Sequence, residues 1–284
     1  MAQAKRREEP VETSTPEPVG ASSAAVAEVP FEVPQPLSRN TMMVLAGLVV
    51  LFNLPLIHYY LLRGAPPATV SLPFSDSYED PMTVSKNYFS TGGHYRTVGG
   101  QLLSPGVKNN PLWLKAKLPQ NVAVDFDVKS QSQEGDIKCE IFGDGTDHAS
   151  GYVLIHGGWN NSMSVIARLD EHGAPVAQLQ QEANRIASDK KLGSAGLKET
   201  GVFTPTTRMR VEAAQGVHYP VQIGKTYHWR IERRGSLLTW FIDGQKYMEF
   251  DDPFPLVGDK HDRFAFSSWE AELYFDNLKI APLN

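Results

Sequence analysis

The chain has 284 residues, of which 41% are hydrophobic and 21% are charged, so it is long enough to bury a sizeable core. It carries 27 Lys and Arg residues against 32 Asp and Glu residues, a formal net charge of −5 at pH 7. Because the sequence predicts no basic face, this balance argues against a nucleic-acid partner. Cys139 is the only cysteine, which excludes an internal disulfide.

Residues 1–40 are predicted to form a disordered tail. They are rich in Pro, Glu, Ala and Ser, and Phe31 is their only aromatic residue. Such a segment has too little apolar surface to offset the entropy that it would lose on ordering. The basic residues 5–7 are followed at once by two glutamates, so we interpret them as part of the solvated tail.

Residues 41–62 contain no Asp, Glu, Lys or Arg, and their length matches the roughly 20 residues that cross a bilayer. A buried core helix is the weaker interpretation, because such helices usually carry some charge. A cleaved signal peptide also fits less well, because a long polar segment precedes the apolar run and no small-residue cleavage site follows Leu62. We therefore expect an uncleaved, single-pass anchor in an inner or plasma membrane.

The orientation of this anchor depends on few charges. Arg39 and Arg63 bracket the segment and cancel in the positive-inside rule, while the basic residues 5–7 favour a cytoplasmic tail. The carboxy-terminal part is then expected outside the cytoplasm. Residues 63–71 are predicted to be a short tether that contains proline, and residues 72–284 to form one domain.

Residues 72–284 show the two-residue alternation of half-buried strands, most clearly in a hairpin over residues 227–244. Tyr227, Trp229 and Ile231 share one face of its first strand, and Gly235 supplies the positive φ of the turn. Five further segments alternate in the same way: 122–128, 137–142, 151–156, 163–169 and 209–213. Because long helices between strands are mostly missing, the fold class predicted is all-β, an antiparallel β-sandwich or jelly roll.

One segment, residues 174–191, departs from this pattern. It places five residues along one helical stripe, which predicts a surface helix inserted between strands: Val176, Leu179, Ala183, Ile186 and Ala187. The residues that follow, up to Thr207, are typical of a loop. We interpret the helix as a decorative insertion, with a functional lid as the alternative.

The closing strands resemble those of concanavalin A-like jelly rolls, including laminin-G-like and keto-disaccharide hydrolase-like domains. The resemblance covers residues 72–283 and is carried by segments 227–235, 238–244, 264–269 and 273–280. It implies two curved antiparallel sheets, with carbohydrate recognised on the concave face or by the rim loops. Its motifs are structural, so the resemblance indicates a fold rather than an activity.

A binding site for sugar is predicted around the segment GGWNN. Its glycines expose the backbone, and the two Asn amides supply the donors and acceptors that hydroxyls need. A strand face leads to this segment, and a second loop carries another Trp next to Glu270. The alternative is that both tryptophans close the ends of the core. The candidate ligand-binding residues are Trp159, Asn160, Asn161, Tyr152, His156 and Trp269.

No catalytic motif is found. The paired acids Glu-x-Asp-x-x-Glu of the glucanases in this superfamily are missing, and so are a nucleophile elbow, a phosphate loop and a dinucleotide fingerprint. Several acids alternate on predicted strands opposite basic residues, which we interpret as a charge ladder on a solvated face rather than a catalytic pair. These acids are Asp125, Asp127, Glu140 and Glu232, and the bases are Lys138, Arg208, Arg210 and Arg230.

Metal sites receive little support from the sequence. Asp144 and Asp147 lie in a loop with oxygen ligands and are a weak candidate for calcium, although two Asp residues near a Gly also describe any turn. The His residues beyond the membrane segment show no close pairing, which argues against zinc. No cofactor is therefore expected.

Three functions remain open at this stage. The chain is a membrane-anchored module that recognises carbohydrate or an envelope polymer, a protein-interaction or sensor subunit of a membrane complex, or a sugar-active hydrolase. The first is favoured, because aromatic and amide residues are at hand while a catalytic motif is not. Glycan, the membrane and other proteins are thus the expected partners.

Overall fold

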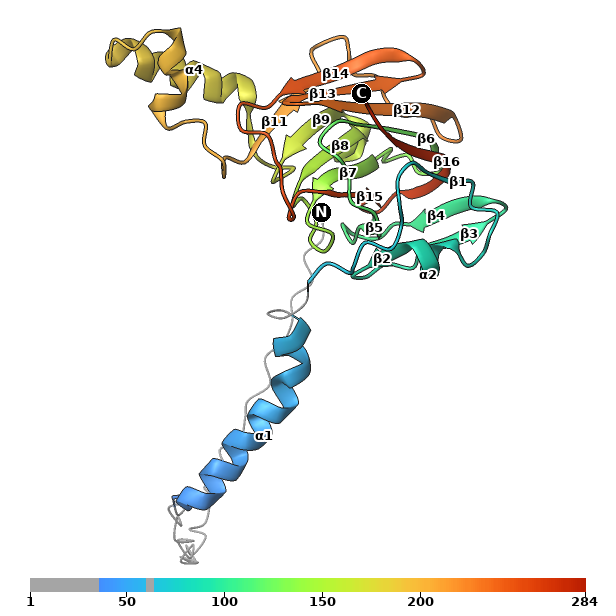
Figure 1. Cartoon of the computed structure of the whole chain (residues 1–284), viewed down its shortest axis with the longest axis vertical. Helices are drawn as coiled ribbons and strands as arrows, with labels where there is room; N and C mark the ends of the chain where they lie inside the picture. The colour runs from blue at the N-terminus through green and yellow to red at the C-terminus, as the bar shows by residue number, and fades with distance from the viewer. Residues whose placement is uncertain (1–35, 60–63) are drawn as a thin grey trace, which may run out of the picture. The chain divides into compact units, whose positions relative to one another are not determined.

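The structure is a computed structural model that describes residues 36–59 and 64–284 (Figure 1). Residues 1–35 of the predicted tail lie outside the described residues. The same holds for residues 60–62 of the predicted membrane span and for Arg63 at the start of the predicted tether.

The first of two compact units, Met1–Leu61, contains helix α1 (Arg39–Ile57). Ser38 precedes this helix, and its Oγ accepts the backbone N–H of Thr41 at 3.1 Å, which satisfies one of the free donors of the first turn. No side chain of α1 is buried, and among the described helices α1 alone is long and apolar enough to cross a membrane. It begins two residues before the predicted start of the span at Thr41.

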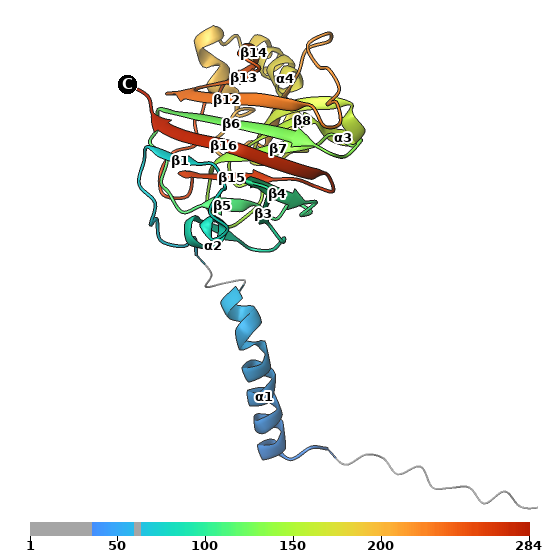
Figure 2. The same cartoon turned by 90° about the vertical axis from the view of Figure 1, so that its right-hand side faces the viewer.

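The second unit, Leu62–Asn284, is a β-sandwich of two eight-stranded sheets. Figure 2 shows β12, β6 and β16 of the first sheet in front of β8, β7 and β15 of the second. The first sheet contains, in order across it, β14 (Gln245–Asp251), β13 (Leu237–Ile242), β12 (Thr226–Arg234), β6 (Val122–Ser130), β16 (Glu272–Pro282), β4 (Gln101–Pro105) and β3 (Arg96–Val98), with β1 (Phe74–Asp76) paired to β16. The second contains β10 (Ala174–Pro175), β11 (Met209–Glu212), β9 (Met163–Arg168), β8 (Tyr152–Gly157), β7 (Ile137–Gly143), β15 (Arg263–Ser267), β5 (Leu112–Leu114) and β2 (Tyr88–Ser90).

The predicted antiparallel β-sandwich is confirmed. Among the described strands, neighbours pair antiparallel except in the short β10–β11 pair, which is parallel. The chain crosses repeatedly between the sheets, for example from β4 to β5, from β5 to β6 and from β6 to β7, as jelly rolls do. All five segments predicted as strands form strands, namely β6, β7, β8, β9 and β11.

The core between the sheets contains the hairpin β12–β13 in the predicted register. The alternate side chains of both strands are at most 2% exposed, and Trp229 and Trp240 lie with ring centroids 4.4 Å apart. Gly235 in the turn has a φ of +61°, a conformation that favours glycine. The two-residue period of the sequence therefore predicts correctly which face of this hairpin is buried.

Strands β7 and β8 of the second sheet are buried on both faces. One face packs into the core between the sheets, through Cys139 and Leu154 among others. On the other face, Val153, Ile155 and Val165 form a smaller apolar cluster, against which Trp159 packs. This second face of the sheet positions the candidate site.

Helix α4 (Val176–Asp189) is the predicted inserted helix, and it lies between β10 and β11 in the chain. Its buried residues are Ala183 and Ala187, both on the predicted apolar stripe. It contacts β11 and the 3₁₀ helix Ser194–Thr200. The remaining short helices are α2 (Thr83–Asn87) and α3 (Gly158–Asn161).

The segment predicted as a tether, residues 63–71, contacts the sandwich. The backbone N–H groups of Thr69 and Val70 both donate to the carbonyl of Lys115 at 2.9 Å, and the Val70 side chain packs against the core. The carbonyl of Pro66 accepts a hydrogen bond from Arg263 Nη2 at 3.2 Å. The ordered domain therefore includes residues before the predicted start at residue 72.

The predicted charge ladder is present on the outer face of the first sheet, whereas Arg208 and Arg210 pair in the second sheet region with acids outside the prediction, Asp170 and Glu212. Arg230 Nη1 donates to both oxygens of Asp125 at 2.8 and 2.9 Å, and its Nη2 lies 2.7 Å from Glu232. The prediction is wrong for Glu140 and Lys138. They belong to β7 in the second sheet and are buried, because loops cover that face.

Candidate functional site

A pocket of about 440 Å³ opens on the face of the second sheet that is turned away from the core between the sheets. Strand β7 supplies its floor, and the surrounding walls come from α3 and from the loops that follow β4, β6, β9 and β15. The lining residues are Asn109, Glu134, Asp136, Lys138, Ile155, Gly158, Trp159, Asn160, Glu171, His172, Trp269 and Glu270. Both tryptophans predicted to contact sugar thus line the same pocket.

Trp269 is the more exposed of the two, with 48% of its surface open to solvent. Its backbone is fixed on both sides, since its N–H donates to Asp136 Oδ2 at 2.6 Å and its carbonyl accepts the N–H of Lys108 at 2.7 Å. A large aromatic side chain is therefore held at the surface by a rigid loop. Such a residue is suited to ligand contact, because ordering it on binding costs little entropy.

Trp159 lies in a turn with unusual backbone geometry. Trp159, Asn160 and Asn161 have φ angles of +50°, +57° and +61°, in the left-handed region that costs side-chain-bearing residues roughly 1–2 kcal/mol each. Asn161 holds this turn in place, since its Oδ1 accepts the N–H of Val221 at 2.7 Å and its Nδ2 donates to the Val221 carbonyl at 2.8 Å. The ring of Trp159 meets His172 edge to face, with centroids 5.8 Å apart.

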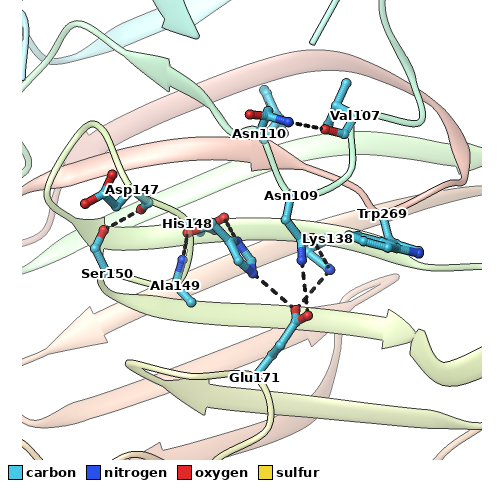
Figure 3. A network of polar contacts seen from close by, with 12 residues as sticks. Val107, Asn109, Asn110, Lys138, Asp147, His148, Ala149, Ser150, Glu171 and Trp269 are labelled. Carbon is cyan, nitrogen blue, oxygen red and sulfur yellow. Dashed lines mark hydrogen bonds and ion pairs between the residues drawn. The ribbon is translucent and has the colours of Figure 1, made fainter. Parts of the chain in front are cut away.

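The floor of the pocket is a buried ionic network centred on Glu171 (Figure 3). Lys138, which is 2% exposed, donates from Nζ to Glu171 Oε2 at 3.0 Å and to Asn109 Oδ1 at 2.9 Å. Asn109 Nδ2 donates to the other oxygen of Glu171 at 3.2 Å. These contacts fix the positions of all three side chains without using a ligand.

His148 extends the network to a carboxylate beneath it. Its Nδ1 lies 2.6 Å from Oε1 of the fully buried Glu140, and its Nε2 forms an ion pair with Glu171 at 3.4 Å. Burial and the charge of Lys138 act to lower the pKa of His148, but the charge of Glu140 and hydrogen bonding to Glu140 and Glu171 outweigh them and raise this pKa to about 9. His148 is therefore an imidazolium ion at neutral pH, and it balances charge between the two carboxylates.

Two lining carboxylates have opposite pKa shifts. Burial acts to raise the pKa of Glu171, but His148 and Lys138 together hold this pKa well below its usual range. Burial raises the pKa of Asp136, against the effects of Lys138 and the Trp269 N–H. Asp136 Oδ1 lies 3.7 Å from Lys138 Nζ, which is beyond hydrogen-bond length, so this oxygen has unused acceptor capacity.

Three residues nominated from the sequence do not line the pocket. Tyr152 and His156 point into the core from the opposite face of β8, where Tyr152 donates to Asp252 at 2.6 Å and His156 Nε2 lies 2.9 Å from the Tyr219 carbonyl. Asn161 shapes the turn through Val221 instead of facing the pocket. Of the six nominated residues, the structure brings together Trp159, Asn160 and Trp269.

The weak calcium candidate is a turn closed by its own hydrogen bonds. Asp144 Oδ1 accepts the N–H groups of Thr146 at 2.7 Å and of Asp147 at 2.8 Å. Among the described residues, no group of three or more His, Cys, Asp and Glu side chains is placed to hold a metal ion.

Several polar residues of the pocket were missed by the sequence reasoning. Asp136, Glu171 and Asn109 lie in loops without a recognisable motif, and Lys138 was assigned to the charge ladder. One pattern in the sequence does point to these residues. Lys138 and Glu140 alternate with apolar residues in a short strand segment that has glycines on both sides. Buried charges of this kind need partners, which points to a network.

No protein-family model matches the chain, and no curated protein sequence matches it. Among solved structures, the chain is similar to the carbohydrate binding module CBM66 from Bacillus subtilis, with 10% identity and a TM-score of 0.45 over 76% of this chain and 99% of that one. It is similar to alginate lyase Aly36B, with 12% identity and a TM-score of 0.44 over 78% and 99%. A sialidase is matched with 10% identity and a TM-score of 0.48 over 78% of this chain and only 19% of the sialidase. At these identities and TM-scores, the similarities identify neither a ligand nor a reaction for this chain.

Proposed function

We propose that the sandwich is a carbohydrate-binding domain whose ligand occupies the pocket lined by Trp159 and Trp269. The observation that carries this proposal is that two tryptophans from separate loops line one pocket above a pre-ordered polar floor. Aromatic walls with a few fixed polar groups are typical of small-ligand sites, and they match the apolar faces and the hydroxyl edges of a sugar ring.

The strained turn at Trp159 supports the same proposal. Left-handed conformations at three successive residues with side chains persist only where the surroundings impose them, and such strain gathers at binding sites. Here the surroundings are the two hydrogen bonds between Asn161 and Val221. Their effect is to hold Trp159 on the pocket wall before any ligand arrives.

The contacts of Glu171 and Asp136 favour binding over turnover at the floor of the pocket. Glycoside hydrolysis needs two carboxylates that are free to act on the scissile bond. Both oxygens of Glu171 are already bound by Lys138 and Asn109, and one oxygen of Asp136 is bound by the Trp269 N–H. The acids of the first sheet are engaged as well, since Asp125 pairs with Arg230.

A glycan array tests this function. The full chain in lipid nanodiscs should bind one class of oligosaccharide, and Trp269→Ala should weaken binding about tenfold or more, because it removes an exposed aromatic contact. Trp159→Ala should have a similar effect. Tyr274→Ala is the matched control, because Tyr274 is a partly exposed aromatic residue on β16 outside the pocket. Binding that both tryptophan variants retain in full would contradict the proposal.

The membrane arrangement is part of the proposal. Helix α1 would anchor the chain in an inner or plasma membrane, with the sandwich outside the cytoplasm. The support is the length and apolar character of α1 and the basic residues 5–7 before it. Protease added to spheroplasts should then remove the sandwich, whereas full protection of the sandwich from protease would reverse the orientation.

A further inference from the structure

We propose that the pocket selects sugars that carry a free amine over neutral sugars, and that it excludes sugar acids. This inference rests on the proposed carbohydrate-binding function and names the chemical class of the ligand. Two observations support the inference: carboxylates outnumber basic groups in the lining of the pocket, and the basic groups at its floor are already paired with acceptors of the protein.

The lining is rich in carboxylates. Among the described residues that line the pocket there are four, Glu134, Asp136, Glu171 and Glu270, and one lysine, Lys138. Glu270 is balanced only by the exposed Lys108 at 3.7 Å. Glu134 is exposed on the rim. The pocket therefore holds more negative than positive charge.

The basic groups at the floor are committed to protein acceptors. Lys138 is 2% exposed, and its Nζ contacts Asn109 and Glu171 at 2.9 and 3.0 Å. His148 lies between Glu140 and Glu171. At the floor, a ligand carboxylate would have to displace one of these buried contacts to gain a cationic partner, and breaking a buried ion pair is costly.

Acceptors, in contrast, remain available to a ligand. Asp136 is buried, and its Oδ1 on the pocket wall forms an ion pair with Lys138 Nζ at 3.7 Å but has no hydrogen bond to the described residues. Glu134 adds a second carboxylate at the rim. The ligand must therefore donate hydrogen bonds. An ammonium group supplies three donors and a positive charge, whereas a hydroxyl supplies one donor and no charge.

The test compares three oligosaccharides of equal length on the full chain in nanodiscs: a glucosamine oligomer, its N-acetylated counterpart and a galacturonate oligomer. At a pH at which the amines are protonated and at low salt, the glucosamine oligomer should bind about tenfold more tightly than the N-acetylated one. The galacturonate should not bind. Raising the ionic strength should reduce the preference for the amine, because exposed charges are screened.

Glu134→Gln isolates the charge effect. It should reduce the preference for the amine several-fold, because it should weaken binding of the glucosamine oligomer more than binding of the N-acetylated one, and Glu182→Gln on the exposed face of α4 is the matched control. A tetralysine peptide tests for charge alone, and it should bind more weakly than the glucosamine oligomer. Tetralysine binding that is as tight and is insensitive to Trp269→Ala would overturn the inference.

The two proposals fail in different ways. Binding of the N-acetylated or galacturonate oligomer at least as tight as that of the glucosamine oligomer, with loss on Trp269→Ala, would overturn the amine preference and leave the carbohydrate site intact. Binding of none of the three, together with an empty glycan array, would overturn both proposals.

Discussion

His148 is the residue whose ionisation links the candidate site to stability. It lies between Glu140 and Glu171, and its pKa is raised from an ordinary value of 6.5 to about 9. A raised pKa in the folded state means that the stabilising contribution is complete below the unfolded pKa and is lost as the pH rises through the folded pKa. Stability linked to His148 should therefore be present below about pH 6.5 and be lost by about pH 9.

The prediction is a fall of roughly 3 kcal/mol in the free energy of unfolding across this window. His148→Gln should be less stable at neutral pH, because Glu140 then lacks its cationic partner, and should show less of this fall. Urea denaturation at a series of pH values measures both. Identical pH dependence in the variant and the parent would show that His148 does not titrate as described.

Asn161 and Asn160 are neighbours with different roles, and this difference can be tested. Asn161→Ala removes both hydrogen bonds to Val221, so it should cost about 1–3 kcal/mol and weaken sugar binding, although Asn161 does not line the pocket. Asn160→Ala should cost less, about 1 kcal/mol or less, because Asn160 is exposed and the change only adds strain at its left-handed backbone, with a φ of +57°. Thermal denaturation and sugar binding should be measured for both variants, to separate the positioning role of Asn161 from direct ligand contact by Asn160. Equal stability of the two variants would contradict the positioning role of Asn161.

At the scale of elements, the hairpin β12–β13 tests the division between the core and the outer face. Trp229 is fully buried against Trp240, so Trp229→Ala should cost roughly 3–5 kcal/mol through the cavity that it leaves. Arg230→Ala should cost about 1 kcal/mol or less, because its ion pairs are partly solvated. Chemical denaturation of the two variants compares these losses. If Trp229→Ala cost less than Arg230→Ala, the buried face of β12 would be the one that carries Arg230, which would contradict the register described here.

The hairpin could be predicted from the sequence, whereas most of the pocket could not. The alternation in β12 and β13 follows the burial of one face only, so each residue type indicates its side of the sheet. In β7 and β8 both faces are buried, so a charged residue does not indicate a solvated face there. The sequence therefore predicts wrongly that Lys138 is exposed. The buried pairing that Lys138 needs comes from Glu171, which is distant in the sequence.

Tyr152 and His156 lead along β8 to the turn that carries Trp159, but they lie on the opposite face of the strand. Tyr152 and Leu154 pack into the core between the sheets, whereas Val153 and Ile155 alternate with them and pack with Trp159 on the outer face. Both faces of β8 are buried, so the residue types of this strand do not indicate which face leads to the pocket.

At the scale of the whole molecule, the sandwich should fold without α1, because its core is contained in the second unit. Residues 64–284 expressed alone should give a soluble, β-rich product. Residues 72–284 should be less stable by about 1–2 kcal/mol, since they lack the packing of Val70 and the hydrogen bonds to Lys115. Circular dichroism with denaturation measures both, and equal stability would restore the view of residues 63–71 as a free tether.

The most direct test of the pocket uses the five tryptophans of the chain as probes. Trp113, Trp229 and Trp240 are at most 1% exposed, whereas Trp159 and Trp269 line the pocket. The indole N–H signals in NMR spectra, assigned by single Trp→Phe substitutions, can be followed during titration with the oligosaccharide that binds best on the array. We predict that the signals of Trp159 and Trp269 shift together and saturate, while the three core signals stay in place. Binding that leaves both pocket signals unmoved would contradict the assignment of this pocket as the carbohydrate site.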